Sequence, residues 1–366
     1  MTGRHIGIAG AGLLGRLLAW RLSAVGHAVD VFDPAAGPDD RTPPQAAGWT
    51  AAGMLSPIAE LETADLATAR RGWRSLDLWT GWLLKLPRQV DFRRQGSLLL
   101  AHRADAGSAQ RLLAVLAAKG AAVAGTGGHV EEAPAGLARS GTWPGPQPLS
   151  LPHLAELEPA VHGPALAWLL PGEGQVHAVQ AMQALTEAAT AQGVRWHWQQ
   201  PVTTAEPGRL DGRRFDHVFD VRGLGARPAL PVRGVRGEVA WVQARGLVLH
   251  RPLRLLHPRW RVYLVPRPDD VVLVGATEIE SEDRSPVSVR SLLGLLSAAH
   301  SVLPELAEGR VLHLETNLRP ALPDNLPCLH AQPGLTRING LFRHGWLLAP
   351  ALVEEALAAL ASETLA

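Results

Sequence analysis

The 366-residue sequence contains a single cysteine, Cys328. One thiol cannot form an internal disulfide, and a cysteine-built zinc site needs several sulfurs, so both are excluded and no metal site is predicted. No apolar run approaches the roughly 18 residues that span a bilayer. The N-terminal stretch carries no signal-peptide pattern before the first predicted strand. These absences favour a cytoplasmic protein without a membrane span.

Charge of one sign is also not in excess. Lys and Arg number 35 against 34 Asp and Glu, which gives a formal net charge of +1. This balance excludes a surface dedicated to the phosphates of DNA. Eight arginines nevertheless fall between Arg233 and Arg267, against one acid, Glu238. They indicate either solvated strand faces or a local field that attracts an anionic substrate or partner.

Apolar residues make up 46% of the sequence, a globular composition, and the length suggests about two domains. The first segment predicts strand, helix and strand at 6–9, 13–25 and 28–33, a βαβ unit of an α/β fold. Leucines at near-helical spacing form one stripe of the helix, and Gly26 is typical of a left-handed C-terminal cap.

The turn inside this unit reads Gly10-Ala11-Gly12-Leu13-Leu14-Gly15. These glycines allow the backbone to approach a pyrophosphate at a helix N-terminus, and Asp33, at the end of the next strand, is placed to accept a bond from a ribose hydroxyl. The pattern predicts a dinucleotide site. FAD and NAD both remain open on this evidence.

The rest of the chain alternates helical and strand-like segments. Helices are predicted at 64–84, 104–119, 178–190, 286–303 and 352–360, with the tryptophans of the first as core residues. Strands are predicted at 96–101, 194–198 and 215–221, and an irregular connection at 120–148. Four further strands, at 237–242, 247–250, 261–265 and 271–274, indicate a sheet-rich second domain, the last two joined as a hairpin through 268–270.

Four segments in order resemble the D-amino-acid oxidase superfamily of FAD-dependent oxidoreductases, most closely the glycine oxidases of thiamine biosynthesis. They are the small-residue loop 47–57, the hairpin 261–278 with its V-P-R and V-G-A-T-E motifs, the L-R-P motif at 318–320 with Asp324, and the segment 342–350. Together these segments extend the resemblance over nearly the whole chain.

The resemblance implies a Rossmann-type FAD-binding domain made of residues 1–85, 149–226 and 311–366, and a sheet-rich substrate domain made of 86–148 and 227–310. It implies non-covalent FAD, because the position that carries cysteine in relatives with covalent flavin holds Asn317 here. The predicted cofactor-binding residues are Gly10, Gly12, Leu13, Leu14, Gly15, Asp33, Thr50, Ala51, Ala52, Gly53, Met54, Val202, Gly223, Gly345 and Trp346.

Three residues are predicted to act on the substrate. A planar guanidinium can hold an amino-acid carboxylate with two parallel bonds, and the resemblance assigns this task to Arg319. It assigns a substrate-site hydroxyl to Tyr263, the only tyrosine, and a place near substrate and flavin to Arg343. A structural ion pair for Arg319 and an ordinary strand position for Tyr263 are the alternatives. Glu278 receives no role.

The predicted function is FAD-dependent oxidation of the C–N bond of a small amino acid or secondary amine. Hydride passes to flavin N5, the product is an imine, and oxygen is the acceptor, with a role in thiamine thiazole synthesis implied by the resemblance. Three alternatives stay open: a D-amino-acid dehydrogenase with a quinone or protein acceptor, a tRNA-modifying amine oxidase that uses the 233–267 arginines, and a non-catalytic flavin-binding protein. A homo-oligomer is compatible with the sequence.

Overall fold

The computed structural model describes residues 3–125, 144–257 and 261–363. Its first layer is a six-stranded sheet in the order β19-β20-β13-β1-β2-β9, in which only β19 runs antiparallel to its neighbour. The strands are β1 (His5–Ala9), β2 (Ala28–Asp33), β9 (Arg195–Trp198), β13 (His217–Asp220), β19 (Cys328–Gln332) and β20 (Leu335–Asn339). The predicted βαβ unit is therefore the centre of a Rossmann-like sheet.

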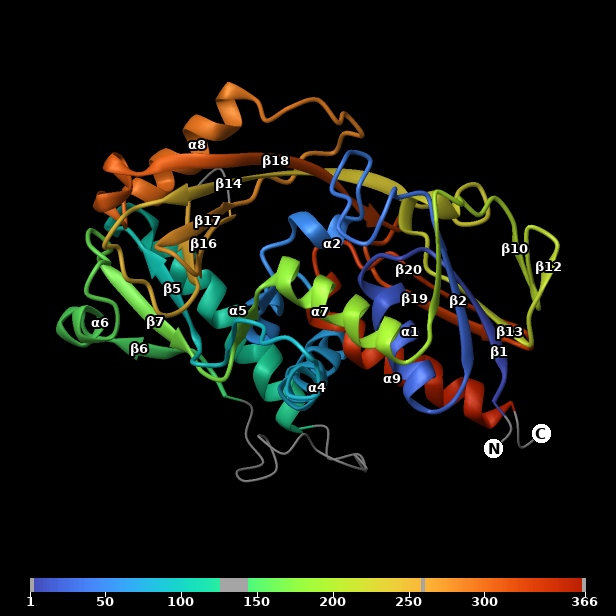
Figure 1. Cartoon of the computed structure of the whole chain (residues 1–366). Coiled ribbons are helices and arrows are strands. Elements are labelled where there is room, and N and C mark those ends of the chain that lie inside the picture. Colours follow the sequence, from blue (N-terminus) through green and yellow to red (C-terminus); the bar gives the residue numbers. More distant parts are fainter. Residues whose placement is uncertain (1–2, 126–143, 258–260, 364–366) are drawn as a thin grey trace.

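Helices pack beside this sheet in a mostly apolar layer. Helix α1 (Leu13–Ala24) contacts α7 (Ala178–Ala191) and α9 (Gly345–Ser362), and α4 (Leu66–Leu83) contacts α9 (Figure 1). Trp73, Trp79 and Trp82 of α4 are buried, as predicted. Gly26 ends α1 at φ +89°, which confirms the left-handed cap.

Helix α9 consists mostly of apolar residues but is interrupted by Glu354 and Glu355, so it contains no uninterrupted apolar run of about 18 residues. Among the described residues it is the one helix long and apolar enough to cross a membrane, with a mean hydropathy of 1.3 over 18 residues. More than half of the helix is buried inside the protein. Its apolar surface is used for packing, as in the core helix of a globular fold.

The second layer is an eight-stranded sheet in the order β18-β14-β17-β16-β15-β5-β7-β6, antiparallel except between β15 and β5. Figure 1 shows its long strands β14 and β18 crossing the top of the molecule, below α8 (Val289–His300), with α5 (Ala106–Gly125) near β5. The strands are β5 (Ser97–Ala101), β6 (Gln147–Leu149), β7 (Leu166–Leu170), β14 (Arg233–Gln243), β15 (Leu253–Leu256), β16 (Arg261–Arg267), β17 (Val271–Gly275) and β18 (Arg310–Ala321).

Short elements complete the fold. The strands β3 (Met54–Leu55), β8 (Gly174–Val176) and β4 (Phe92–Arg93) form a three-stranded sheet, and β10 (Ala205–Glu206), β11 (Arg209–Leu210) and β12 (Arg213–Arg214) form another. The short helices are α2 (Ala47–Thr50), α3 (Pro57–Glu60) and α6 (Leu151–Leu157). The predicted α/β class with a sheet-rich second part is confirmed.

The domain boundaries remain our prediction. The six-stranded sheet draws its strands only from the three segments predicted for the FAD-binding domain. Two of those segments also supply β7 and nearly all of β18 to the eight-stranded sheet. The chain therefore crosses between the two sheets more often than the predicted boundaries state.

Several local predictions were wrong. Residues 247–250 form no strand, because a turn at Arg245–Gly246 leaves Leu247 and Leu249 to pack in the core without strand pairing. Strands β15 and β18 were not predicted. Cys328 lies half-buried on the edge strand β19. Of the predicted connection 120–148, residues 126–143 lie outside the described residues, and α5 extends to Gly125.

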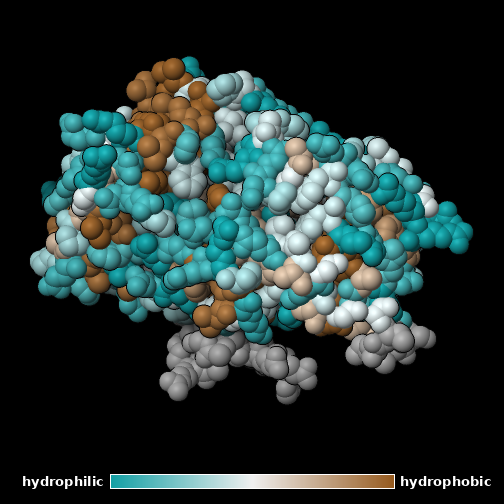
Figure 2. All heavy atoms as spheres, viewed as in Figure 1, coloured by the Kyte–Doolittle hydropathy of each residue, from teal (hydrophilic) through white to brown (hydrophobic). Residues whose placement is uncertain are grey.

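Apolar side chains are exposed at one end of the eight-stranded sheet. Figure 2 shows a hydrophobic patch over α8. There Val289 and Leu293 are exposed, as are Val311, Leu312 and Leu314 on the edge strand β18. Exposed patches of this kind often mark protein contacts, so the homo-oligomer stays a prediction.

Candidate active site

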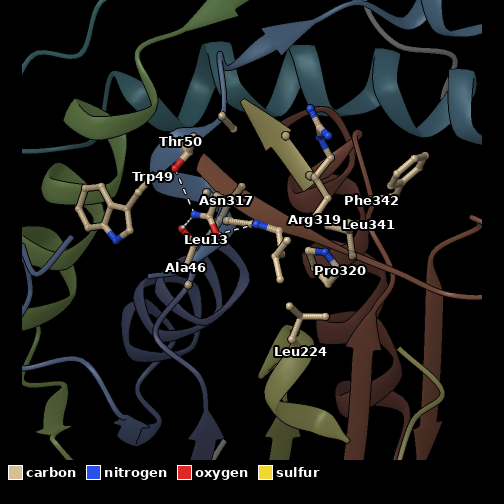
Figure 3. Close-up of a pocket in the computed structure, with 18 of the residues that line it drawn as sticks. Leu13, Ala46, Trp49, Thr50, Leu224, Asn317, Arg319, Pro320, Leu341 and Phe342 are labelled. Atoms are coloured by element: carbon tan, nitrogen blue, oxygen red, sulfur yellow. Dashed lines mark hydrogen bonds between the residues drawn. The ribbon is translucent and has the colours of Figure 1, made fainter. Parts of the chain in front are cut away.

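A single cavity of about 1470 Å³ contains most of the predicted site residues. Figure 3 shows part of it, where Leu13, Thr50 and Arg319 lie around one space. The predicted residues that line it are Gly10, Gly12, Leu13, Leu14, Asp33, Thr50, Ala51, Ala52, Gly53, Met54, Val202, Gly223, Tyr263, Arg319, Arg343, Gly345 and Trp346. Gly15 does not line the cavity.

The nucleotide end of the cavity is formed by the turn before α1. Gly10 has φ +103°, and a Cβ there would lie 2.8 Å from the carbonyl oxygen of Val221. Gly12 is the N-cap of α1 and makes no side-chain cap bond, and no acid occupies the first turn. The first backbone N–H groups of α1 are thus left for an anion. A Cβ at Gly15 would meet the carbonyl of Gly10, so this glycine allows α1 to pack against the turn.

Asp33 is positioned by the same turn. Its carboxylate accepts the N–H of Ala11 at 2.6 Å and that of Ala35 at 2.9 Å. It therefore lies at the end of β2, beside the glycine turn, where a ribose hydroxyl is expected. Each carboxylate oxygen has more than one lone pair, so these bonds leave acceptor capacity for a ligand.

Arg16 supports this region and was missed by the sequence analysis. Although it belongs to α1, its side chain is buried and donates to the carbonyls of Ala11 at 2.8 Å and Met182 at 3.1 Å. Its guanidinium lies 4.9 Å from the ring of Trp49. Burial lowers the pKa of Arg16 to about 10. An arginine on an amphipathic helix is usually exposed, so no sequence signal distinguished it.

Asn317 joins the two parts of the fold at the cavity. Its Nδ2 donates to Thr50 Oγ1 at 3.1 Å and to the carbonyl of Ala46 at 3.3 Å (Figure 3). Its Oδ1 accepts the N–H of Leu318 at 2.8 Å. The amide therefore fastens β18 to the small-residue loop around α2.

Arg319 points into the cavity with no acidic partner among the described residues. Its Nη1 donates to the carbonyl of Arg236 at 3.2 Å and its Nη2 to that of Thr277 at 3.0 Å. Its guanidinium also lies close enough to the hydroxyl of Tyr263 for each group to affect the pKa of the other. Burial lowers the pKa of Arg319 and raises that of Tyr263. These contacts position the guanidinium, and the described residues include no acid that forms an ion pair with it.

Two glycines make room for this pair. A Cβ at Gly237 would lie 2.5 Å from Nη2 of Arg319, and a Cβ at Gly275 would lie 2.7 Å from the ring of Tyr263. Gly237 lies on β14, beside β18, and Gly275 lies opposite Tyr263 on β17. The sheet register therefore sets both side chains against neighbouring backbone, which fixes their directions.

Arg343 is held differently, between two acids. Its Nη2 lies 2.7 Å from Glu60 and its Nη1 lies 3.1 Å from Glu278, and Glu60 raises the pKa of Arg343. Glu60 also pairs with Arg254 at 2.6 Å and lies 3.3 Å from Nδ1 of His344. Burial alone would raise the pKa of Glu60, but Arg343 and Arg254 outweigh it and hold that pKa well below the usual range.

The arginines between 233 and 267 do not form a free basic surface. Arg233 pairs with Glu280, Arg236 with Glu238, Arg251 with Glu158, Arg254 with Glu60, and Arg261 with Glu62. Arg267 is buried and donates to the carbonyl of Ala52. Of the other two, Arg245 is exposed and Arg259 lies outside the described residues. Neither solvated strand faces nor an unpaired field describes this group, because five of its arginines are paired, four of them with acids from distant segments.

Comparisons with known proteins agree on one family. A family described as "FAD dependent oxidoreductase" matches residues 5–359. A Rhizobium etli protein whose name describes it as a thiamine biosynthesis oxidoreductase, ThiO, is 34% identical to this protein. The alignment covers 97% of this chain and 96% of the relative's own length.

Solved structures share the fold. Glycine oxidase from Geobacillus kaustophilus superposes with a TM-score of 0.78 at 24% identity, covering 99% of this chain and 95% of its own. Iminodiacetate oxidase from Chelativorans sp. BNC1 also gives 0.78, at 21% identity, covering 98% and 95%. At these identities the likeness shows the fold.

Proposed function

The chain belongs to the family of FAD-dependent oxidoreductases, and from this premise we propose that it oxidises the carbon–nitrogen bond of a small amino acid or secondary amine. Glycine is the preferred candidate, and the imine product would serve thiamine thiazole synthesis. The names of the relatives support this assignment, since they include a ThiO and a glycine oxidase.

One observation carries the proposal. The half-buried guanidinium of Arg319, which has no acidic partner among the described residues, lines the same cavity as the glycine turn at Gly10 and Gly12. A partly desolvated cation without a counter-charge is costly, and a carboxylate ligand supplies the missing charge with bidentate bonds. The cavity therefore suits a dinucleotide together with a small organic anion.

The residues present fit FAD. Gly10 and Gly12 leave the backbone open at the helix N-terminus, where Cβ atoms would intrude or a cap would compete. Asp33 would hold the ribose, and the loop 50–54, Gly345 and Trp346 would enclose the remainder of the cofactor. When bound, the flavin supplies a hydride acceptor. Asn317 offers no thiol, so we propose that FAD is held without a covalent bond.

The chain itself orients the substrate. Arg319 would bind the carboxylate with its free N–H groups, and the hydroxyl of Tyr263 would add one bond to the same group. Fixing one end of a molecule as small as glycine restricts where its Cα hydrogen points, which is the main requirement for hydride loss. Arg343, shared by Glu60 and Glu278, would form the wall of the substrate space.

The test is the visible spectrum of the purified protein. We expect a yellow protein whose flavin absorbance bleaches on anaerobic addition of glycine or sarcosine. In aerated buffer, hydrogen peroxide should form in step with amine consumption. A flavin that no member of an amine panel reduces would refute the proposal, and reduction without peroxide would assign a quinone or protein acceptor instead of oxygen.

A further inference from the structure

Glu278 is an acid at the cavity wall with one oxygen free. Its Oε2 accepts from Nη1 of Arg343 at 3.1 Å, and its Oε1 has no hydrogen-bond partner among the described residues. The side chain is 48% exposed and lines the cavity, so the free oxygen is accessible to a ligand there.

The backbone holds this carboxylate beside Arg319. The carbonyl of Thr277, the preceding residue, accepts from Nη2 of Arg319 at 3.0 Å. Glu278 lies close enough to oppose, by its charge, the effect of burial on the pKa of Arg319. One wall of the cavity therefore presents Arg319, which has no acidic partner among the described residues, next to Glu278, which has a free carboxylate oxygen.

The other acids near this wall are occupied. Glu60 is buried between Arg254, Arg343 and His344, and Glu62 pairs with Arg261 at 3.1 Å. A substrate that binds Arg319 through its carboxylate has its amine one carbon away. Among these acids, only Glu278 both lines the cavity and keeps an oxygen without a partner.

We propose that Glu278 binds the amine of the substrate and takes one proton from its ammonium form. This assignment rests on the proposed function. In this step an N–H bond of the ammonium breaks and an O–H bond forms on Oε1 of Glu278. The electron pair stays on nitrogen as the lone pair that hydride loss from the neighbouring carbon requires.

The arrangement selects for substrates that carry an ammonium group and a carboxylate on the same carbon atom. An amino acid satisfies both Arg319 and Glu278, whereas a 2-hydroxy acid of the same size satisfies only Arg319. The site would therefore distinguish an amine from a hydroxyl by charge, because a carboxylate bonds an ammonium more strongly than a neutral hydroxyl.

The test replaces Glu278 with Gln, which keeps the shape and removes the charge. We expect kcat/KM for glycine to fall about 10- to 100-fold, the range for losing a charged hydrogen bond and a proton acceptor. The dissociation constant of glycolate, followed by its perturbation of the flavin spectrum, should change less than about twofold, since glycolate has no amine. Glu280→Gln is the matched control, because Glu280 pairs with Arg233 away from the cavity.

A pH profile separates proton transfer from shape. The variant must use substrate that is already deprotonated, so its kcat/KM should rise more steeply with pH than that of the wild-type protein. Glu278→Asp should restore part of the rate. The pH profile must be interpreted against the other charged and titratable groups of this wall. They are Glu60, Arg254, Tyr263, Arg319, Arg343 and His344.

The outcomes distinguish this inference from the proposed function. If wild-type protein oxidises glycine and Glu278→Gln matches it, the assignment of Glu278 is wrong and the proposed function stands. Equal losses for glycine turnover and glycolate binding would also overturn it, since they would show a general distortion. If wild-type protein oxidises no amine, the proposed function fails and the assignment falls with it.

Discussion

Arg319 has to satisfy two conditions at once: it must stay positioned without substrate and keep N–H groups for it. The carbonyls of Arg236 and Thr277 meet the first condition, and the lack of an acid partner among the described residues meets the second. In Arg319→Ala the substrate carboxylate is left unpaired, so we expect kcat/KM to fall by about 2 to 5 kcal/mol, roughly 30-fold to several thousand-fold. FAD content should be unchanged. Arg310→Ala, on the exposed end of β18, is the control, and glycine oxidation that survives within a few-fold would make Arg319 structural.

Tyr263 and Arg319 are predicted to hold one group. Tyr263→Phe keeps the ring against Gly275 and removes one hydrogen bond, so kcat/KM should fall by about 0.5 to 2 kcal/mol. The double change with Arg319→Ala should cost less than the sum of the single changes, because the two residues share a ligand. Steady-state kinetics of the four proteins measures this coupling. Strict additivity would place Tyr263 away from the carboxylate.

At the scale of elements, the pairing of β14 with β18 sets the direction of Arg319. Gly237 lies on β14, opposite Asn317, and its missing side chain makes the space for the guanidinium. Gly237→Ala should displace the guanidinium while leaving every predicted ligand group present. We expect kcat/KM to fall roughly 10- to 100-fold, the cost of a displacement near 1 Å, with FAD content unchanged.

The matched control is Gly81→Ala, because a Cβ at Gly81 in helix α4 meets nothing within 4 Å. A variant at Gly237 with normal turnover would show that the guanidinium adapts to the lost space. The Arg319 guanidinium would then bind the carboxylate as a mobile charge rather than as a group held in one position.

Helix α7 begins at a half-buried histidine. His177 is the N-cap, and its Nδ1 accepts the N–H of Gln180 at 3.4 Å. Burial, aided by Arg267, lowers the pKa of His177 to about 4 from 6.5. Because this pKa is depressed in the folded state, the contribution to stability is complete above pH 6.5 and is lost as the pH falls toward 4.

We therefore expect the Tm to fall between pH 7 and pH 5, with about 1 to 2 kcal/mol less free energy of unfolding at the lower pH. His177→Asn keeps a cap acceptor that does not titrate, so its Tm should depend less on pH. Some dependence should remain, because burial also lowers the pKa of His217 to about 4. His330→Asn, exposed on β19, is the control, and identical pH profiles for all three proteins would contradict the prediction.

At the scale of the whole molecule, the cavity is lined by residues of both large sheets and of the loop 50–54. Because position 317 carries an amide and Cys328 does not line the cavity, acid or heat should release intact FAD into the supernatant. At a hundredfold excess over its dissociation constant, FAD should stabilise the folded protein by about 2.7 kcal/mol. Thermal unfolding with and without added FAD measures this effect. Flavin that stays with the precipitated chain would contradict non-covalent binding.

The local sequence pattern determined the first βαβ unit, because all of its signals lie within about 30 residues of one another. These signals are the apolar period and the residues Gly10, Gly12, Gly26 and Asp33. The hairpin through 268–270 was predictable for the same reason. One failure, the missed strand β18, came where pairing is distant. Strand β18 pairs with β14 some 80 residues earlier, and no local signal states which alternating segment finds a partner.

The site shows the same division. The sequence, through motif and resemblance, placed Arg319, Tyr263 and the glycine turn, which the structure brings into one cavity. It could not show that Arg319 has no acid partner, or that Glu278 keeps a free oxygen, because ion pairing depends on which distant acids fold against which arginines. Glu60 and Arg343 are 283 residues apart in sequence and 2.7 Å apart in space. The sequence alone therefore identified which residue types lie at the site. Only tertiary contacts decided which of their charges stay unpaired and can bind a substrate.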